Sequence, residues 1–112
     1  SGVGPRQPGT DAIPGGPIRD DDGNPLDYDA AAQTRAVIEN IRVILEAAGS
    51  NLGRLVDITS YLVDMDRDFA AYNDVYAEYF SDLKATRTTV EVRALPTPIA
   101  VEFKCVALAG NE

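Results

Sequence analysis

Two strand-like runs in the last third of the chain constrain the fold more than any other stretch. Residues 86–95 and 99–108 are joined by a Pro-Thr-Pro corner. In each run, apolar and polar side chains alternate with the period of two that a pleated strand requires. We therefore predict two strands that run antiparallel, each with an apolar face and a face that carries charge.

One arginine and one glutamate on the charged faces are candidates for chemistry. Arg87 lies opposite Val90 and Val92 on the first run, and Glu102 belongs to the polar face of the second. The planar guanidinium fork of arginine can form two parallel hydrogen bonds to a carboxylate, and it stays ionised at any cellular pH. A glutamate can order a water molecule or carry a proton. Together they can bind and hydrolyse an organic acid without a metal. The alternative is that both are solvated charges, even partners, on an antiparallel ladder opposite the core.

Size and charge bound the class of protein. The 112 residues suit a single domain, 1–112, with a modest core. The chain carries 10 Lys and Arg against 18 Asp and Glu, and this net charge of -8 repels a phosphate backbone. No apolar run approaches the ~20 residues that span a bilayer. We expect a soluble, cytoplasmic protein that binds neither nucleic acid nor membrane.

The residues that the chain lacks narrow the chemistry further. It has no histidine, which is the commonest general base and metal ligand. Its single cysteine, Cys105, falls on the apolar face of the last run, and we interpret it as a small buried hydrophobe. A nucleophilic thiol would need a base beside it. We expect no metal site and no cofactor, and the lone cysteine fits a reducing compartment.

Residues 3–29 form a long segment rich in proline and glycine. Residues 1–25 hold five of the seven prolines and six of the nine glycines, so regular structure is not expected there. The acidic run 20–22 lacks the spacing of a calcium loop and is interpreted as a solvated turn. Because irregular segments of this length are usually functional or flexible, we expect a surface loop beside a site.

A first helix is expected after this loop. Asp27 or Asp29 is its expected N-cap, and Gly49 follows its C-terminus as the residue after a C-cap does. Its apolar positions follow helical spacing. They are Val37, Ile38, Ile41, Ile44, Leu45 and Ala48.

A second helix is expected over residues 69–80, with Asp66 or Asp68 as its N-cap. Five aromatic side chains gather on roughly one side of this helix, which indicates core or a subunit contact rather than a cofactor site. They are Phe69, Tyr72, Tyr76, Tyr79 and Phe80. Residues 55–63, rich in Val, Ile, Thr and Tyr, are predicted to form the strand between the two helices.

The order of these elements predicts an α+β fold, a mixed sheet with two helices packed on one face. The other face carries Thr59, Tyr61, Val106 and Leu108, and it is too apolar to stay in contact with water. A homo-oligomer that buries this face is the simplest expectation.

Short motifs along the chain recur in an order typical of one family. They are Ser1-Gly2, Ala32-Gln33-Thr34-Arg35, Glu39-Asn40-Ile41, residues 45–50, Asp64-Met65, residues 73–76, residues 86–92, Leu95-Pro96 and Val101-Glu102. From Ser1 to about Ala109 the chain resembles the Rid family, also called YjgF/YER057c/UK114, of enamine and imine deaminases. The Arg-Thr-Thr-Val-Glu-Val strand and the Leu-Pro that follows are the most specific pieces. Within the family, the chain looks like the branch that includes 2-aminomuconate deaminases.

This resemblance implies a fold, an assembly and an activity. The fold would be chorismate-mutase-like, in a homotrimer whose sheets line a central barrel and whose three sites lie between neighbouring subunits. The activity would be the hydrolysis of 2-enamine or 2-imine carboxylic acids to 2-oxo acids and ammonia. Arg87 would grip the substrate carboxylate and Glu102 would hold the attacking water. The resemblance also implies substrate-binding roles for Ser1, Gly2, Asn73, Thr89 and Pro96.

Two departures from the family pattern affect this expectation. Many members have cysteine where this chain has Thr89, so a role for a thiol would be lost while a backbone hydrogen bond would survive. Family members carry a further segment before the Ser-Gly, an edge hairpin that includes a pocket tyrosine in many of them. The sequence lacks that hairpin, and a chain that truly began at Ser1 would miss one wall of the pocket.

Two other functions remain open at this point. The same pocket can hold a small acid without turnover, in a trimer that acts as a sensor or a chaperone-like scavenger. A role on RNA has been claimed for some members of the family. The net charge of -8 and the absence of histidine argue against that role here.

Overall fold

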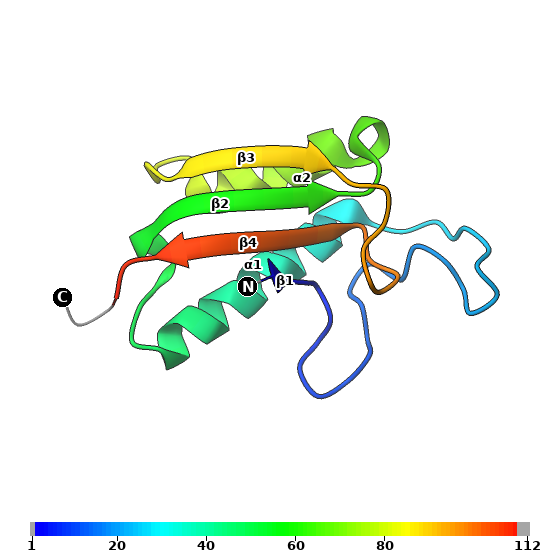
Figure 1. The fold of residues 1–112 in the computed structure, drawn as a ribbon, viewed down its shortest axis with the longest axis horizontal. Helices are drawn as coiled ribbons and strands as arrows, with labels where there is room; N and C mark the ends of the chain where they lie inside the picture. Colours follow the sequence, from blue (N-terminus) through cyan, green and yellow to red (C-terminus); the bar gives the residue numbers. More distant parts are fainter. Residues whose placement is uncertain (1, 110–112) are drawn as a thin grey trace.

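The computed structural model describes residues 2–109 as one sheet with two helices on one of its faces (Figure 1). The strands lie in the order β1-β4-β2-β3. They are β1 (Gly2–Val3), β2 (Leu55–Leu62), β3 (Thr86–Glu91) and β4 (Val101–Ala107). The helices are α1 (Ala30–Ala47) and α2 (Met65–Phe80), and a 3-10 turn, η1 (Leu52–Arg54), precedes β2. The predicted α+β architecture with a mixed sheet is confirmed.

Strand β2 lies at the centre of the sheet. It pairs in parallel with β3 and antiparallel with β4, so β3 and β4 run in opposite directions, as predicted. They are not neighbours, however, because β2 lies between them (Figure 1). The alternative in which Arg87 and Glu102 pair across one ladder is therefore wrong.

The charged face of β3 points the opposite way from what the alternation suggests. Arg87 is in register with Ile58 of β2, which is fully buried under the helices, whereas Val90 is in register with Tyr61 on the open face. Val90 is exposed and Arg87 contacts α2. The expectation that Arg87 lies on the face away from the core is wrong. Strand β3 is at the edge of the sheet, and α2 lies close enough for Asn73 to contact Arg87.

Helix α1 begins and ends where the sequence predicts. The Asp29 side chain accepts a hydrogen bond from the backbone N–H of Ala32, and Gly49, at φ 81°, follows the C-cap. Val37 and Ile38 are fully buried, but Ile44, predicted on the apolar face, is exposed. The reason is that β1 has only two residues, so the last turns of α1 extend past the edge of the sheet (Figure 1).

Helix α2 begins one turn earlier than predicted, and its N-cap is Asp64, which accepts from the backbone N–H of Arg67. The prediction of Asp66 or Asp68 as the cap is wrong. Asp68 is fully buried instead, and its carboxylate accepts hydrogen bonds from the Tyr28 hydroxyl and the Arg67 guanidinium.

The aromatic stripe of α2 belongs largely to the core, as predicted. Tyr72 is fully buried and Phe80 nearly so, and the rings of Tyr72 and Phe103 from β4 pack in a T-shaped arrangement. Phe69 lies at the margin and is exposed. The apolar layer between the sheet and the helices therefore extends as far as Tyr76, which is half-buried at the margin of this layer.

Buried polar side chains fasten the long loop to the rest of the fold. Gln33 of α1 is fully buried; its amide N–H donates to the carbonyl of Gly16 (3.0 Å) and its carbonyl accepts from the N–H of Ala100 (2.8 Å). The Asn40 amide donates to the carbonyls of Gly4 and Arg6, each at 2.9 Å. The loop therefore follows a defined path along α1.

The acidic run in this loop forms a turn, as interpreted from the sequence. The Asp20 carboxylate accepts from the backbone N–H groups of Asp22 and Asn24. Among residues 2–109, no group of three or more His, Cys, Asp or Glu side chains is placed to hold a metal ion. None of the described helices is long and apolar enough to cross a membrane.

Candidate functional site

The predicted site residues form two groups on opposite faces of the sheet. The first group surrounds Arg87, on the face that the helices cover. Its guanidinium donates to the Asn73 amide oxygen at 2.7 Å, and its central carbon lies 4.3 Å from the centroid of the Tyr76 ring. Asn73 and Tyr76 are three residues apart on α2, so one turn of helix supplies both contacts.

Thr89 lies two residues further along β3, on the same face as Arg87. Its hydroxyl is 3.0 Å from the Tyr72 hydroxyl, which also donates to the Ser60 hydroxyl at 2.6 Å. The Thr89 side chain is therefore occupied by an internal contact. What it leaves for a ligand is its backbone, on the outer edge of a strand that ends the sheet.

The second group surrounds Glu102, on the open face of the sheet. Glu102 is in register with Tyr61 of β2, and its carboxylate lies against the backbone of Gly2. A Cβ at position 2 would meet that carboxylate, so any residue other than glycine there requires the Glu102 side chain to move. Glu102 forms no salt bridge with any residue from 2 to 109.

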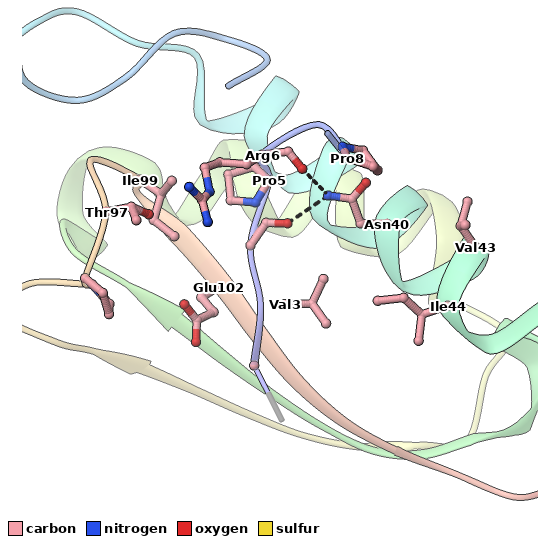
Figure 2. Close-up of a pocket in the computed structure, with 13 residues that line it drawn as sticks. Val3, Pro5, Arg6, Pro8, Asn40, Val43, Ile44, Thr97, Ile99 and Glu102 are labelled. Carbon is pink, nitrogen blue, oxygen red and sulfur yellow. Dashed lines mark hydrogen bonds between the residues drawn. The ribbon is translucent and has the colours of Figure 1, made fainter. Parts of the chain in front are cut away.

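Two cavities flank the Glu102 carboxylate. The larger has a volume of about 430 Å³ and includes Gly2, Glu102 and Pro96 in its lining. Figure 2 shows Glu102 on one side of it, with Val43 and Ile44 of α1 on the other. The smaller, about 260 Å³, opens on the face that carries Tyr61 and has Leu95, Glu102 and Lys104 in its lining.

Arg87 and Glu102 of one chain cannot hold the same small molecule. They lie on opposite faces with β2 between them, and their partners on β2, Ile58 and Tyr61, are three residues apart. Three residues of strand correspond to roughly 10 Å. The two groups can serve one ligand only where two copies of the chain meet.

The structure thus brings together the predicted residues in two subsets: Asn73 and Thr89 with Arg87, and Gly2 and Pro96 with Glu102. The remaining predicted residue, Ser1, lies outside the described residues. The sequence predicts Tyr72 and Tyr76 to be core or subunit-contact residues, and this prediction missed their contacts with Thr89 and Arg87. The sequence could have indicated these contacts, because Tyr72 is adjacent to Asn73 and Tyr76 lies one helical turn from it. The prediction also missed Lys104, which follows Glu102 on the same strand face.

Cys105 lies on the helix-facing side of β4, in register with Ile58, and is half-buried. Burial, and to a lesser extent the charge of Asp57, raises the pKa of its thiol to about 11. The thiol therefore stays protonated at neutral pH, as the interpretation of Cys105 as a small hydrophobe requires.

Three comparisons place the chain among known proteins. The family model described as Endoribonuclease L-PSP matches residues 12–109. A RutC family protein of Pyrococcus horikoshii is 46% identical over 91 residues, covering 81% of this chain and 71% of that protein. The crystal structure of E. coli TdcF with bound serine superimposes with a TM-score of 0.77 at 32% identity, covering 96% of this chain and 76% of its own.

A further crystal structure carries the family name in its description. It is that of a Mycobacterium tuberculosis protein described as a member of the highly conserved YjgF/YER057c/UK114 family. It is 34% identical to this chain, with a TM-score of 0.68, and the match covers 70% of this chain and 67% of that one. The order and the packing of the elements described above are therefore those of solved family structures, and the chain belongs to the YjgF/YER057c/UK114 family, also called the Rid family.

Proposed function

We propose that the protein hydrolyses 2-enamine or 2-imine carboxylic acids to 2-oxo acids and ammonia. The observation that carries this proposal is how Arg87 is held. Arg6, Arg35, Arg42 and Arg67 each pair with a carboxylate, whereas the other four arginines form no salt bridge with a described residue; these are Arg19, Arg54, Arg87 and Arg93. Arg87 is fixed by a neutral amide and an aromatic ring, and it forms no salt bridge with any described carboxylate. Its charge therefore stays available for the carboxylate of a ligand.

The reaction needs a held carboxylate and a held water. The enamine tautomerises to the imine, water adds to the C=N carbon, and ammonia leaves to give the 2-oxo acid. Arg87 fixes the carboxylate and so places the reactive carbon, while Glu102 orients the water and takes its proton. Backbone groups on the outer edge of β3 near Thr89 accept the departing nitrogen. A positioned acid–base group contributes about 10²–10⁴-fold, which suffices for a substrate that already hydrolyses unaided.

The site requires a second copy of the chain, and we propose the homotrimer of the family with its sheets around a central barrel. The open face of the sheet carries Val90, Val106 and Leu108 exposed, and an apolar face of this kind favours burial against another copy. In that assembly Arg87 of one subunit faces Glu102 of the next.

For the physiological substrate, we propose 2-aminomuconate, whose second carboxylate needs a second cation. Lys104 follows Glu102 on the same face of β4 and lines the same cavity. It forms no salt bridge within residues 2–109. A chain with a net charge of -8 thus places a free ammonium beside the proposed water-binding glutamate. Lys104→Met should raise KM for 2-aminomuconate more than KM for iminopyruvate, which has one carboxylate.

The test of the proposed reaction is ammonia release from freshly generated iminopyruvate and 2-aminomuconate. Many molecules of ammonia per subunit, above the uncatalysed rate, are expected. The second candidate is a trimer that binds small acids without turnover, which the bound serine in the TdcF structure favours. Saturable binding with no acceleration of either hydrolysis would replace the first proposal by the second.

A further inference from the structure

The Arg87 guanidinium lies over an aromatic ring to which no role in binding or chemistry has yet been assigned. The central carbon of Arg87 is 4.3 Å from the Tyr76 ring centroid and 5.8 Å from that of Tyr72. At 4.3 Å the cation and the ring face are in direct contact. The Tyr76 ring is the nearer of the two and packs directly against the charged group.

One hydrogen bond alone does not fix an exposed arginine. The Asn73 amide oxygen holds one terminal nitrogen of Arg87 at 2.7 Å, and the guanidinium can still rotate about that contact. The Tyr76 ring packed against the guanidinium limits this rotation. With the amide at one end and the ring on one side, the remaining N–H groups of Arg87 have few orientations left, which favours the paired hydrogen bonds that a carboxylate accepts.

The Tyr76 ring is itself held firmly. It lies edge-on to Phe80, with centroids 4.9 Å apart, and within 6.4 Å of Phe103 from β4. Its hydroxyl makes no hydrogen bond to a described residue, in contrast to those of Tyr72 and Tyr79. Burial raises the pKa of Tyr76, so the phenol is neutral at physiological pH. The ring face, rather than the hydroxyl, is what Arg87 contacts.

We propose that Tyr76 is a positioning residue, whose ring sets the plane and direction of the Arg87 fork before a carboxylate arrives. This inference rests on the proposed function, in which Arg87 takes the substrate carboxylate. It goes beyond that function by assigning a role to Tyr76, which the proposed reaction does not itself use. It also explains why Tyr76 and Asn73 are one helical turn apart, since both must reach the same guanidinium.

The experiment compares Tyr76→Phe, which keeps the ring, with Tyr76→Leu, which removes it. Tyr79→Leu is the matched control, because Tyr79 lies on the same helix and has an arginine, Arg35, over its ring at 5.8 Å. Three quantities are measured: KM and kcat for freshly generated iminopyruvate, the inhibition constant of pyruvate, and the NMR order parameter of the Arg87 Nε–H group. Thermal unfolding of each variant is recorded alongside.

Tyr76→Phe should stay within about twofold of the wild type in KM, and Tyr79→Leu should do the same. Tyr76→Leu should raise KM and the pyruvate inhibition constant by about tenfold or more, with a smaller change in kcat, and lower the Arg87 order parameter. If Tyr76→Leu unfolds at the assay temperature, Tyr76→Met fills the core in its place without a ring face.

Wild-type constants in a folded Tyr76→Leu or Tyr76→Met variant would overturn the inference. An equal loss in Tyr76→Phe would also overturn it, because the hydroxyl would then be the part that acts. An absence of turnover in the wild type would refute the proposed function instead. The Arg87 order parameter would still decide about Tyr76, since it does not depend on catalysis.

Discussion

At the scale of single residues, the site is built on groups whose charge the chain leaves uncompensated. Arg87 is held by an amide and a ring, and Glu102 lies against the Gly2 backbone without a cationic partner among residues 2–109. An uncompensated charge lowers the stability of the folded protein but strengthens ligand binding. A bound carboxylate or water then meets a charge that is not already neutralised.

Arg87→Ala should lower kcat/KM for iminopyruvate by about a hundredfold or more, because two charge-assisted hydrogen bonds to the carboxylate are lost. Arg87→Lys should fail almost as badly, since an ammonium cannot replace the planar fork. Arg35→Ala removes an exposed arginine that also lies near a tyrosine ring, and it should leave the rate unchanged. Retained ammonia release by Arg87→Ala, in a variant of native oligomeric size, would remove Arg87 from the mechanism.

Cys105 gives a second test at this scale, through its raised pKa. The shift from 9.0 to about 11 is two units, which corresponds to about a hundredfold less thiolate at pH 8. Alkylation of the native protein by iodoacetamide at pH 8 should therefore be about a hundredfold slower than alkylation of the protein unfolded in urea. The rate should keep rising up to about pH 11. A native rate that levels off near pH 9 would contradict the shift.

At the scale of elements, the sequence predicts what local chemistry decides. The Asp29 cap, the Gly49 terminus and the alternation in β4 depend on neighbours within a few residues, and all three predictions are confirmed. The cap of α2 was predicted wrongly, because Asp68 is buried by Tyr28, forty residues away in the chain. No local pattern carries that contact.

The face of Arg87 could not be predicted for a similar reason. The alternation in residues 86–92 shows which side chains share a face, but not which face the helices cover. That choice depends on the parallel pairing of β3 with β2 and on the reach of α2 over the sheet edge. Of the candidate site, the residue identities were thus accessible from the sequence, while their division into two groups was not.

Gln33 provides a test of how the elements hold the long loop. In Gln33→Leu, the buried N–H of Ala100 loses its acceptor and the carbonyl of Gly16 loses its donor. An unsatisfied buried polar group costs about 1–3 kcal/mol, so the free energy of unfolding should fall by roughly that amount. Arg35→Leu, on the exposed side of α1, should leave stability close to the wild type. Urea denaturation measures both, and equal stability of Gln33→Leu and the wild type would mean that the loop is held elsewhere.

At the scale of the whole molecule, the separation of Arg87 from Glu102 determines how activity depends on assembly. Within one chain β2 lies between the two side chains, which point to opposite faces. A proposed site therefore takes Arg87 from one subunit and Glu102 from its neighbour. The same separation means that a dissociated subunit should have no activity, however well folded.

This arrangement allows two inactive variants to repair each other. In a trimer that mixes Arg87→Ala with Glu102→Ala subunits, one of the three interfaces joins an intact arginine to an intact glutamate. Random mixing in equal amounts makes about three quarters of the trimers mixed, so about a quarter of the wild-type activity should return. The two variants are unfolded together in urea, refolded as a mixture and assayed for ammonia release. Separately refolded samples, combined without unfolding, provide the control and should stay inactive until subunits exchange. A refolded mixture no more active than this control would show that each site takes both groups from one chain, against the geometry of the sheet.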